Sequence, residues 1–251
     1  MAEPPSVVFL GPTLRREAAR QIADALYLPP AAQGSIVQAV RRHAPRRLLI
    51  IDGLFQSEPA VRHKEILWAL DQGVAVLGAA SMGALRAAEL YPFGMEGVGL
   101  IYRWYRRWIG APDDAVAVVH TPAEVGAEAL TLSLIDLLRT IRRAARRGAL
   151  TPAQTRHLEA AARRLNFRER LWENVLDGTG IEAGRLARFL VEQKKQDAIA
   201  ALRHLDKVNP PARKGGFVWT TNFVRDLDHA KIALADETSF PIALRDGRFA
   251  S

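Results

Sequence analysis

Four short apolar runs constrain the fold of this chain more than any other feature. They cover residues 7–10, 48–51, 74–77 and 115–119, and each ends in small or polar residues. Amphipathic patterns of helical period occupy residues 14–26, 35–43, 59–71 and 82–90. Short apolar runs that alternate with such helices are typical of buried parallel strands joined by crossover helices. We therefore predict an α/β fold with a parallel sheet flanked by helices.

The pattern changes near residue 121. Long helical patterns follow at 124–147 and 152–165, and each lies near a Thr-Pro pair, a common helix start. A chain of 251 residues is long enough for a core domain and a helical appendage. We predict an α/β core domain at 1–120, an all-helical, arginine-rich C-terminal portion at 121–208, and a tail or lid at 209–251.

The composition excludes several kinds of chemistry. The chain has no cysteine, so disulfides, thiolate nucleophiles and iron–sulfur clusters are ruled out, and it cannot carry sulfur as its own persulfide. Its six histidines show no metal-ligand spacing, and no glycine-rich phosphate-binding motif follows a strand. The first residues do not resemble a secretory signal, and no apolar stretch reaches the roughly 20 residues that span a bilayer. We expect a cytoplasmic protein without a membrane segment, metal or other cofactor.

Positive charge is concentrated in the helical portion. The net charge is +8, and residues 139–170 hold ten arginines against two glutamates. Such a face can dock an acidic protein or nucleic acid, and a merely solvated face is the alternative. Aromatic residues and arginines also interleave at 102–108, but Trp104 and Trp108 share one helical face, which favours packing over nucleic-acid binding. We expect a protein-docking surface formed by Arg139, Arg142, Arg143, Arg146 and Arg147.

Candidate functional residues follow the predicted strands. In an open parallel sheet, ligands bind at the carboxyl ends of the strands. Seven residues lie at or just beyond these ends: Gly11, Thr13, Asp52, Gly53, Ser81, His120 and Glu124. We expect them to converge on one cleft, bordered also by His63.

Ser81 is the candidate nucleophile. It lies in Ala79-Ala80-Ser81-Met82-Gly83, directly after a strand and before a helix, which matches the small-x-Ser-x-Gly form of a nucleophile elbow. The Met82 N–H would then face a developing oxyanion. A serine in this position is, however, more often only the N-cap of the next helix.

A serine nucleophile needs a base, and two histidines qualify. His120 follows the fourth predicted strand, and His63 begins a helix that follows the second. A lone histidine near a helix start is, however, more often a surface or capping residue. Asp52 could orient the imidazole, or it could be an ordinary turn residue before Gly53.

Several of these motifs together resemble the TfuA-like family. The similar stretches are residues 51–53, 59–61, 63–70 and 80–90, followed by glycines at 94, 97 and 99, while residues 9–12 resemble the family's opening strand. The similarity is specific over residues 7–125 and loose over 126–205. Arg62 departs from the pattern, because the family tends to have a large aromatic residue there.

The resemblance implies a partner of a YcaO-type enzyme, which activates a peptide amide with ATP so that sulfur replaces oxygen. TfuA-like proteins are linked to supplying that sulfur from a thiocarboxylated ubiquitin-like carrier and to helping YcaO bind its precursor peptide. Our candidate catalytic residues remain Ser81, His63, His120 and Asp52. Our candidate substrate-binding residues are Gly11, Pro12, Thr13, Gly53, Lys64, Glu65, Met82, Gly83 and Glu124. A non-catalytic YcaO activator and a nucleic-acid-binding protein are the alternatives.

Overall fold

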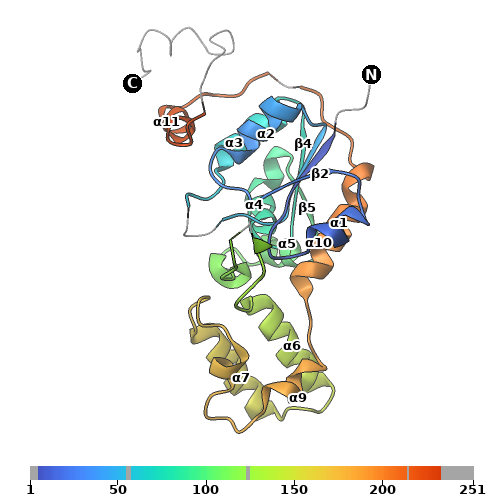
Figure 1. The fold of residues 1–251 in the computed structure, drawn as a ribbon. Coiled ribbons are helices and arrows are strands. Elements are labelled where there is room, and N and C mark those ends of the chain that lie inside the picture. The colour runs from blue at the N-terminus through green and yellow to red at the C-terminus, as the bar shows by residue number, and fades with distance from the viewer. Residues whose placement is uncertain (1–4, 55–57, 123–124, 214, 233–251) are drawn as a thin grey trace.

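A five-stranded parallel sheet forms the centre of the molecule (Figure 1). The computed structural model describes residues 5–54, 58–122, 125–213 and 215–232. The strands are β1 (Ser6–Phe9), β2 (Leu26–Leu28), β3 (Arg47–Ile50), β4 (Ala75–Ala79) and β5 (Glu96–Val98). Their order is β2-β1-β3-β4-β5, and every neighbouring pair is parallel. The predicted α/β class is therefore confirmed.

Helices cover both faces of this sheet. One face packs against α2 (Ser35–His43), α3 (His63–Asp71), α4 (Met82–Leu90) and α5 (Gly99–Arg107). The other face packs against α1 (Arg16–Arg20) and α10 (Gln193–His204), the latter through Ala198, Ala201 and Leu202. Strands β1, β3 and β4 are almost fully buried, which explains why they are continuous apolar runs in the sequence.

A second hydrophobic cluster holds the helical portion together. It lies among α6 (Leu134–Arg146), α7 (Pro152–Arg164), α8 (Trp172–Leu176) and α9 (Ala183–Ala187). Figure 1 shows these helices at one end of the molecule, with α10 leading back to the sheet. Helix α10 therefore packs with the α/β core, although the sequence pattern grouped it with residues 121–208.

Two predicted elements differ from the structure. The helix expected at 14–26 covers only Arg16–Arg20 in the structure. Leu26, the last residue of the expected helix, instead begins β2, which pairs with β1. The strand expected at 115–119 is absent from the described residues, where the 3-10 helix η2 (Asp113–Val116) stands instead. The edge strand β5, which pairs with β4, was not predicted from the sequence. Its surroundings are rich in glycine, which is rare in strands, so no strand pattern is visible around Gly97.

The C-terminal segment packs on the side of α2 and α3. Helix α11 (Thr221–His229) buries Phe223, which lies in an aromatic cluster with Phe217 and Trp219. Gln33 donates a hydrogen bond to the Asp226 carbonyl at 2.7 Å. This part of the predicted tail or lid thus completes the hydrophobic core, and residues 233–251 lie outside the described residues.

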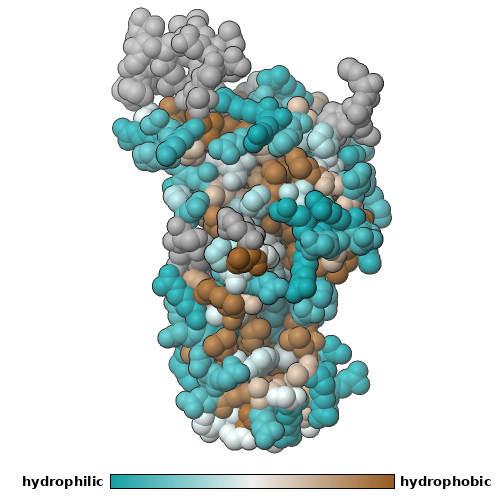
Figure 2. Space-filling view, in the orientation of Figure 1, coloured by the Kyte–Doolittle hydropathy of each residue, from teal (hydrophilic) through white to brown (hydrophobic). Residues whose placement is uncertain are grey.

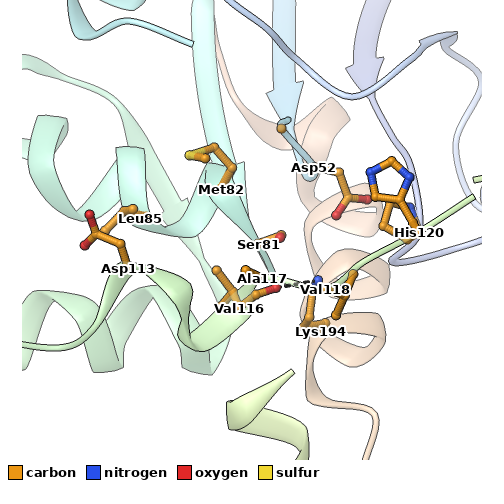
Figure 3. Close-up of a pocket in the computed structure, with 12 residues that line it drawn as sticks. Asp52, Ser81, Met82, Leu85, Asp113, Val116, Ala117, Val118, His120 and Lys194 are labelled. Carbon is orange, nitrogen blue, oxygen red and sulfur yellow. Dashed lines mark hydrogen bonds between the residues drawn. The ribbon is translucent and has the colours of Figure 1, made fainter. Parts of the chain in front are cut away.

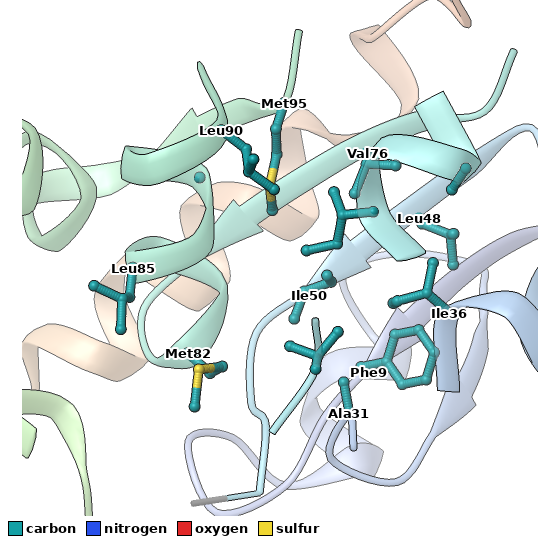
Figure 4. Packing of buried hydrophobic residues seen from close by; sticks show 14 of the residues in the cluster. Phe9, Ala31, Ile36, Leu48, Ile50, Val76, Met82, Leu85, Leu90 and Met95 are labelled. Atoms are coloured by element: carbon teal, nitrogen blue, oxygen red, sulfur yellow. The ribbon is translucent and has the colours of Figure 1, made fainter. Parts of the chain in front are cut away.

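The start of α4 lies unusually close to the sheet, in the region shown in Figure 4. A Cβ atom on Gly83 would lie 1.7 Å from the Ile50 carbonyl oxygen, and one on Gly78 would lie 2.0 Å from the Gly83 carbonyl oxygen. Glycine at both positions is therefore required for this contact. The contact fixes the strand-to-helix turn between β4 and α4.

We predict that Gly83→Ala lowers the free energy of unfolding by about 2–4 kcal/mol, because the new methyl group must displace backbone atoms. Gly184→Ala, in α9, is the matched control, since a Cβ there meets nothing within 4 Å. The control should leave stability unchanged or raise it by up to about 1 kcal/mol. Urea denaturation of both variants tests this, and equal stabilities would contradict it.

Candidate functional site

A small pocket opens at the carboxyl edge of the sheet (Figure 3). It lies beside the ends of β1 and β3, where the strand order reverses direction, the usual ligand position in such sheets. The lining residues are Pro12, Asp52, Gly53, Ser81, Met82, Leu85, Asp113, Val116, Ala117, Val118, His120 and Lys194. Its volume of ≈ 40 Å³ admits a few water molecules or a small polar group.

The turn that presents Ser81 is strained. Ala80 has a φ of +64°, a backbone conformation that residues other than glycine rarely adopt. The Ser81 N–H donates to the Ala79 carbonyl at 2.7 Å, which closes a three-residue turn of an uncommon, costly kind. Strain of this type persists where the surrounding structure enforces it, and it is concentrated at functional sites. Here the close packing of α4 on the sheet enforces it.

Ser81 precedes α4 but does not cap it. Within the described residues its hydroxyl makes no capping hydrogen bond, whereas Ser133 Oγ accepts one from Asp136 N at the start of α6. The Ser81 side chain borders the pocket instead. The adjacent Met82 N–H, the first of α4, has no acceptor in the part of the chain that the structure describes. A hydroxyl and an unused N–H donor therefore stand together at a helix N-terminus.

His120 brings an imidazole to the same pocket. Its Nδ1 lies 2.7 Å from the Thr121 carbonyl oxygen, which only accepts hydrogen bonds, so Nδ1 carries the proton. The neutral ring then has an unprotonated Nε2 that is able to accept a proton. The backbone that carries the ring is fixed by an isolated antiparallel bridge between His120 and Ala129 and by a hydrogen bond that Leu130 N donates to Val119 O.

Lys194, on α10, brings a buried amino group to the same pocket. Its Nζ donates to the Val116 carbonyl at 2.8 Å, and its side chain lines the pocket. Burial lowers the pKa of Lys194, while the carboxylates of Asp52 and Asp136 oppose that effect. Asp136 Oδ1 also accepts hydrogen bonds from Gln193 N and Lys194 N, which fixes the start of α10.

Asp52 is the buried carboxylate of the pocket, and it organises a loop. Its oxygens accept hydrogen bonds from Gly11 N at 2.9 Å, Thr13 N at 3.2 Å and Thr13 Oγ1 at 2.6 Å. Among the described residues, no histidine bonds to it. The His120 imidazole is oriented by the Thr121 carbonyl instead, and Asp52 holds the loop after β1 in place.

The three candidates on α3 lie away from this pocket. His63 Nε2 is 2.7 Å from Glu89 Oε2, and its side chain is 45% exposed. Lys64 Nζ donates to the Val218 carbonyl and lies 5.0 Å from the Phe217 ring centroid, so it anchors the C-terminal segment.

Glu65, the third of these candidates, is buried and has a structural role. It accepts hydrogen bonds from Gly34 N, Ile36 N and Arg62 N, which join α2 to α3. Burial raises the pKa of Glu65 to about 7, and these N–H donors limit the rise.

Only some of the remaining predicted binding residues line the pocket. Pro12, Gly53 and Met82 line the pocket. Gly11 and Thr13 bond to Asp52, Gly83 packs on β3, and Glu124 lies outside the described residues. The structure thus brings Asp52, Ser81 and His120 together and leaves His63 apart.

Sequence reasoning missed Lys194. The stretch 192–196 is strongly polar and is typical of a solvated helix surface. A usable signal does exist, because position 194 lies one turn before the buried stripe of Ala198, Ala201 and Leu205. A lysine at a stripe position is a buried charge that needs a partner or a function.

The arginines of the helical portion do not form one uniform face. Arg170 is buried and pairs with Asp114 at 2.8 Å, so it is structural. Arg142 pairs with Glu159 at 2.6 Å, and Arg143 bonds to the Leu190 carbonyl. Arg146 and Arg147 are exposed, whereas Arg139 borders a separate groove.

Comparison with protein-family models gives a match to part of the chain. Residues 52–171 match the family model described as TfuA-like protein. This range includes Asp52, Ser81 and His120, but it includes neither Pro12 nor Lys194. A search of curated proteins found no match. No helix within the described ranges is long and apolar enough to cross a membrane, and no group of acidic and histidine side chains there is suited to a metal ion.

Proposed function

Because its residues 52–171 place this chain in the TfuA-like family, we propose that it releases sulfide from a thiocarboxylated ubiquitin-like carrier protein. The sulfide would serve a cytoplasmic YcaO-type enzyme that forms thioamides in a precursor peptide, and the chain would also help that enzyme to engage the peptide. The observation that carries the proposal is the Ser81 hydroxyl, which borders the pocket without capping α4. A pure activator would have no need for this strained, uncapped arrangement.

Nucleophilic attack by Ser81 is the first chemical step. Ser81 Oγ attacks the thiocarboxylate carbon while His120 Nε2 accepts the hydroxyl proton. The Met82 N–H donates to the oxyanion that develops. The C–S bond then breaks, the proton passes from His120 to the departing sulfide, and an ester to Ser81 remains.

Water completes the reaction. His120 deprotonates a water molecule that attacks the ester, and Ser81 regains its proton as the carboxylate leaves. The sum is thiocarboxylate plus water giving carboxylate plus hydrogen sulfide, so atoms and charge balance. No thiol of the protein is needed, which agrees with a chain that contains no cysteine.

Lys194 addresses the main electrostatic difficulty of this reaction. A thiocarboxylate is already an anion, and attack on it concentrates further negative charge in a small, poorly hydrated space. The Lys194 ammonium group is buried beside the pocket, with one of its three donors directed to Val116. It would offset the charge of both the bound anion and the tetrahedral intermediate.

The shape of the pocket supports an extended, side-chain-free substrate tail. Small residues surround Ser81, namely Gly53, Gly78, Ala79, Ala80 and Gly83, and the free volume is ≈ 40 Å³. The terminal thiocarboxylate of a glycine-ended carrier would fit such a slot, whereas bulky acyl groups would not.

Ser81→Ala should reduce sulfide release from a thiocarboxylated carrier by at least about 10³-fold, because the nucleophile is lost. Ser133→Ala is the matched control, since this serine caps α6. It should cost about 1 kcal/mol of stability and retain activity. Sulfide assays and thermal melts on both variants measure this. A less stable but fully active Ser81→Ala protein would make Ser81 structural and favour the activator reading.

His120→Gln should slow sulfide release by about 10²-fold or more, because the base is removed while the side-chain volume is roughly kept. His63→Gln is the control, since His63 lies outside the pocket and pairs with Glu89. Single-turnover rates with the carrier report the chemical step. Equal losses in the two variants, or a loss only in His63→Gln, would refute the role of His120.

Lys194→Met should reduce turnover by about 10–100-fold, because the buried positive charge disappears from the pocket. Lys195→Met is the control, since Lys195 is about half exposed, lies outside the pocket and pairs only with Glu192 in the described structure. Measurement of kcat and KM with the thiocarboxylated carrier, at a temperature where circular dichroism shows both variants folded, tests this. Unchanged kinetics in folded Lys194→Met would exclude the electrostatic role.

A further inference from the structure

A second concave surface lies away from the pocket, between the end of α5 and the helices α6 and α7. This α5–α6 groove is lined by Leu100, Trp104, Arg107, Trp108, Ile109, Gly110, Ala111, Pro112, Ile135, Leu138, Arg139, Arg142 and Arg163. In Figure 2, hydrophobic side chains are exposed between hydrophilic ones in the lower half of the molecule, where Figure 1 places the helical portion. The groove shares no lining residue with the Ser81 pocket.

Large apolar side chains are unusually exposed here. Trp108 is 61% exposed and Ile109 is 100% exposed, although both follow directly on a helix whose Ile101 and Tyr105 are buried. Single exposed apolar residues are ordinary, but an exposed tryptophan and isoleucine beside an apolar groove mark an interaction surface. Leu100, Ile135 and Leu138 line the same groove.

Positive charge surrounds this apolar surface. Of the four arginines that line it, Arg142 pairs with Glu159, while Arg107, Arg139 and Arg163 have no carboxylate partner within the described residues. Arg139 is the most informative, because its Nε is buried and lacks a hydrogen-bond acceptor in the described structure. A buried donor of this kind is rare in native proteins and calls for a ligand or a bound water.

The two features together select one kind of occupant. An apolar groove requires a large hydrophobic side chain, and the excess of arginines requires carboxylates beside it. Single-stranded nucleic acid would also supply anions, but the aliphatic residues of the groove offer poor stacking surfaces for bases, and Trp104 is partly packed in the core.

We propose that the α5–α6 groove binds an acidic segment of a partner protein, which inserts one aromatic or aliphatic side chain between the arginines. Trp108 and Ile109 contact that side chain, and Arg107, Arg139 and Arg163 bind the flanking carboxylates. This surface goes beyond the proposed sulfide release and does not depend on it.

Fluorescence anisotropy with a labelled peptide tests the proposal on the full chain. The probe carries a phenylalanine and a leucine between pairs of glutamates, and two control peptides replace the glutamates with glutamines or the apolar pair with alanines. We expect the probe to bind at low salt, more weakly as salt rises, and each control peptide to bind at least about tenfold more weakly.

Variants locate the binding site. Trp108→Ala and Arg163→Glu each remove an exposed groove residue and should weaken probe binding by at least about tenfold. Arg156→Glu makes the same charge change two turns earlier on α7, outside the groove, and should have little effect.

Three results would overturn the proposal. The probe fails to bind at low salt, or Arg156→Glu weakens binding as much as Arg163→Glu does, or a labelled oligothymidylate binds more tightly than the peptide and loses affinity in Arg163→Glu. The last result would instead assign the groove to nucleic acid. Sulfide release by Trp108→Ala and Arg163→Glu should match the wild type, so this test and that of Ser81 fail independently.

Discussion

The contact between α4 and the sheet is the constraint on which the site depends. Gly78 and Gly83 allow the two backbones to approach so closely that any Cβ would collide with a carbonyl oxygen. The chain must then turn from β4 into α4 within very few residues, which drives Ala80 to a φ of +64°. The turn aims Ser81 at the pocket and keeps its hydroxyl from the capping position. Backbone packing at Gly78 and Gly83 thus determines where the Ser81 hydroxyl lies.

Helix α10 makes the second essential connection. Asp136 of α6 fixes its start, and Asp197 accepts a hydrogen bond from Ile101 N at 2.7 Å, so α10 is tied to both the helical portion and α5. Because its apolar stripe packs on the sheet, α10 carries Lys194 to the carboxyl edge of strands that come more than a hundred residues earlier. The pocket is therefore built jointly by the two halves of the chain.

The proposed reactive site and the proposed docking site occupy different parts of the molecule. The Ser81 pocket is small and polar and is lined by the buried side chains of Asp52 and Lys194, which suits a small polar group. The α5–α6 groove is wider, with exposed apolar side chains and arginines, which suits a protein segment. The proposed release of sulfide from one protein for use by another would require surfaces of both kinds.

The sequence alone determined the fold class and much of the pocket edge, because buried parallel strands are continuous apolar runs and ligands gather at their carboxyl ends. Asp52, Ser81 and His120 could be proposed on that basis, and the structure brings them to one pocket. Tertiary structure decided the rest. Local sequence cannot distinguish a serine that caps a helix from one that does not. It also cannot tell which of His63 and His120 lines the pocket, since that depends on contacts with residues distant in the sequence. The place of Lys194 in the pocket could not be predicted for the same reason. Its burial comes from the packing of α10 on the sheet, which the short-range sequence pattern does not encode.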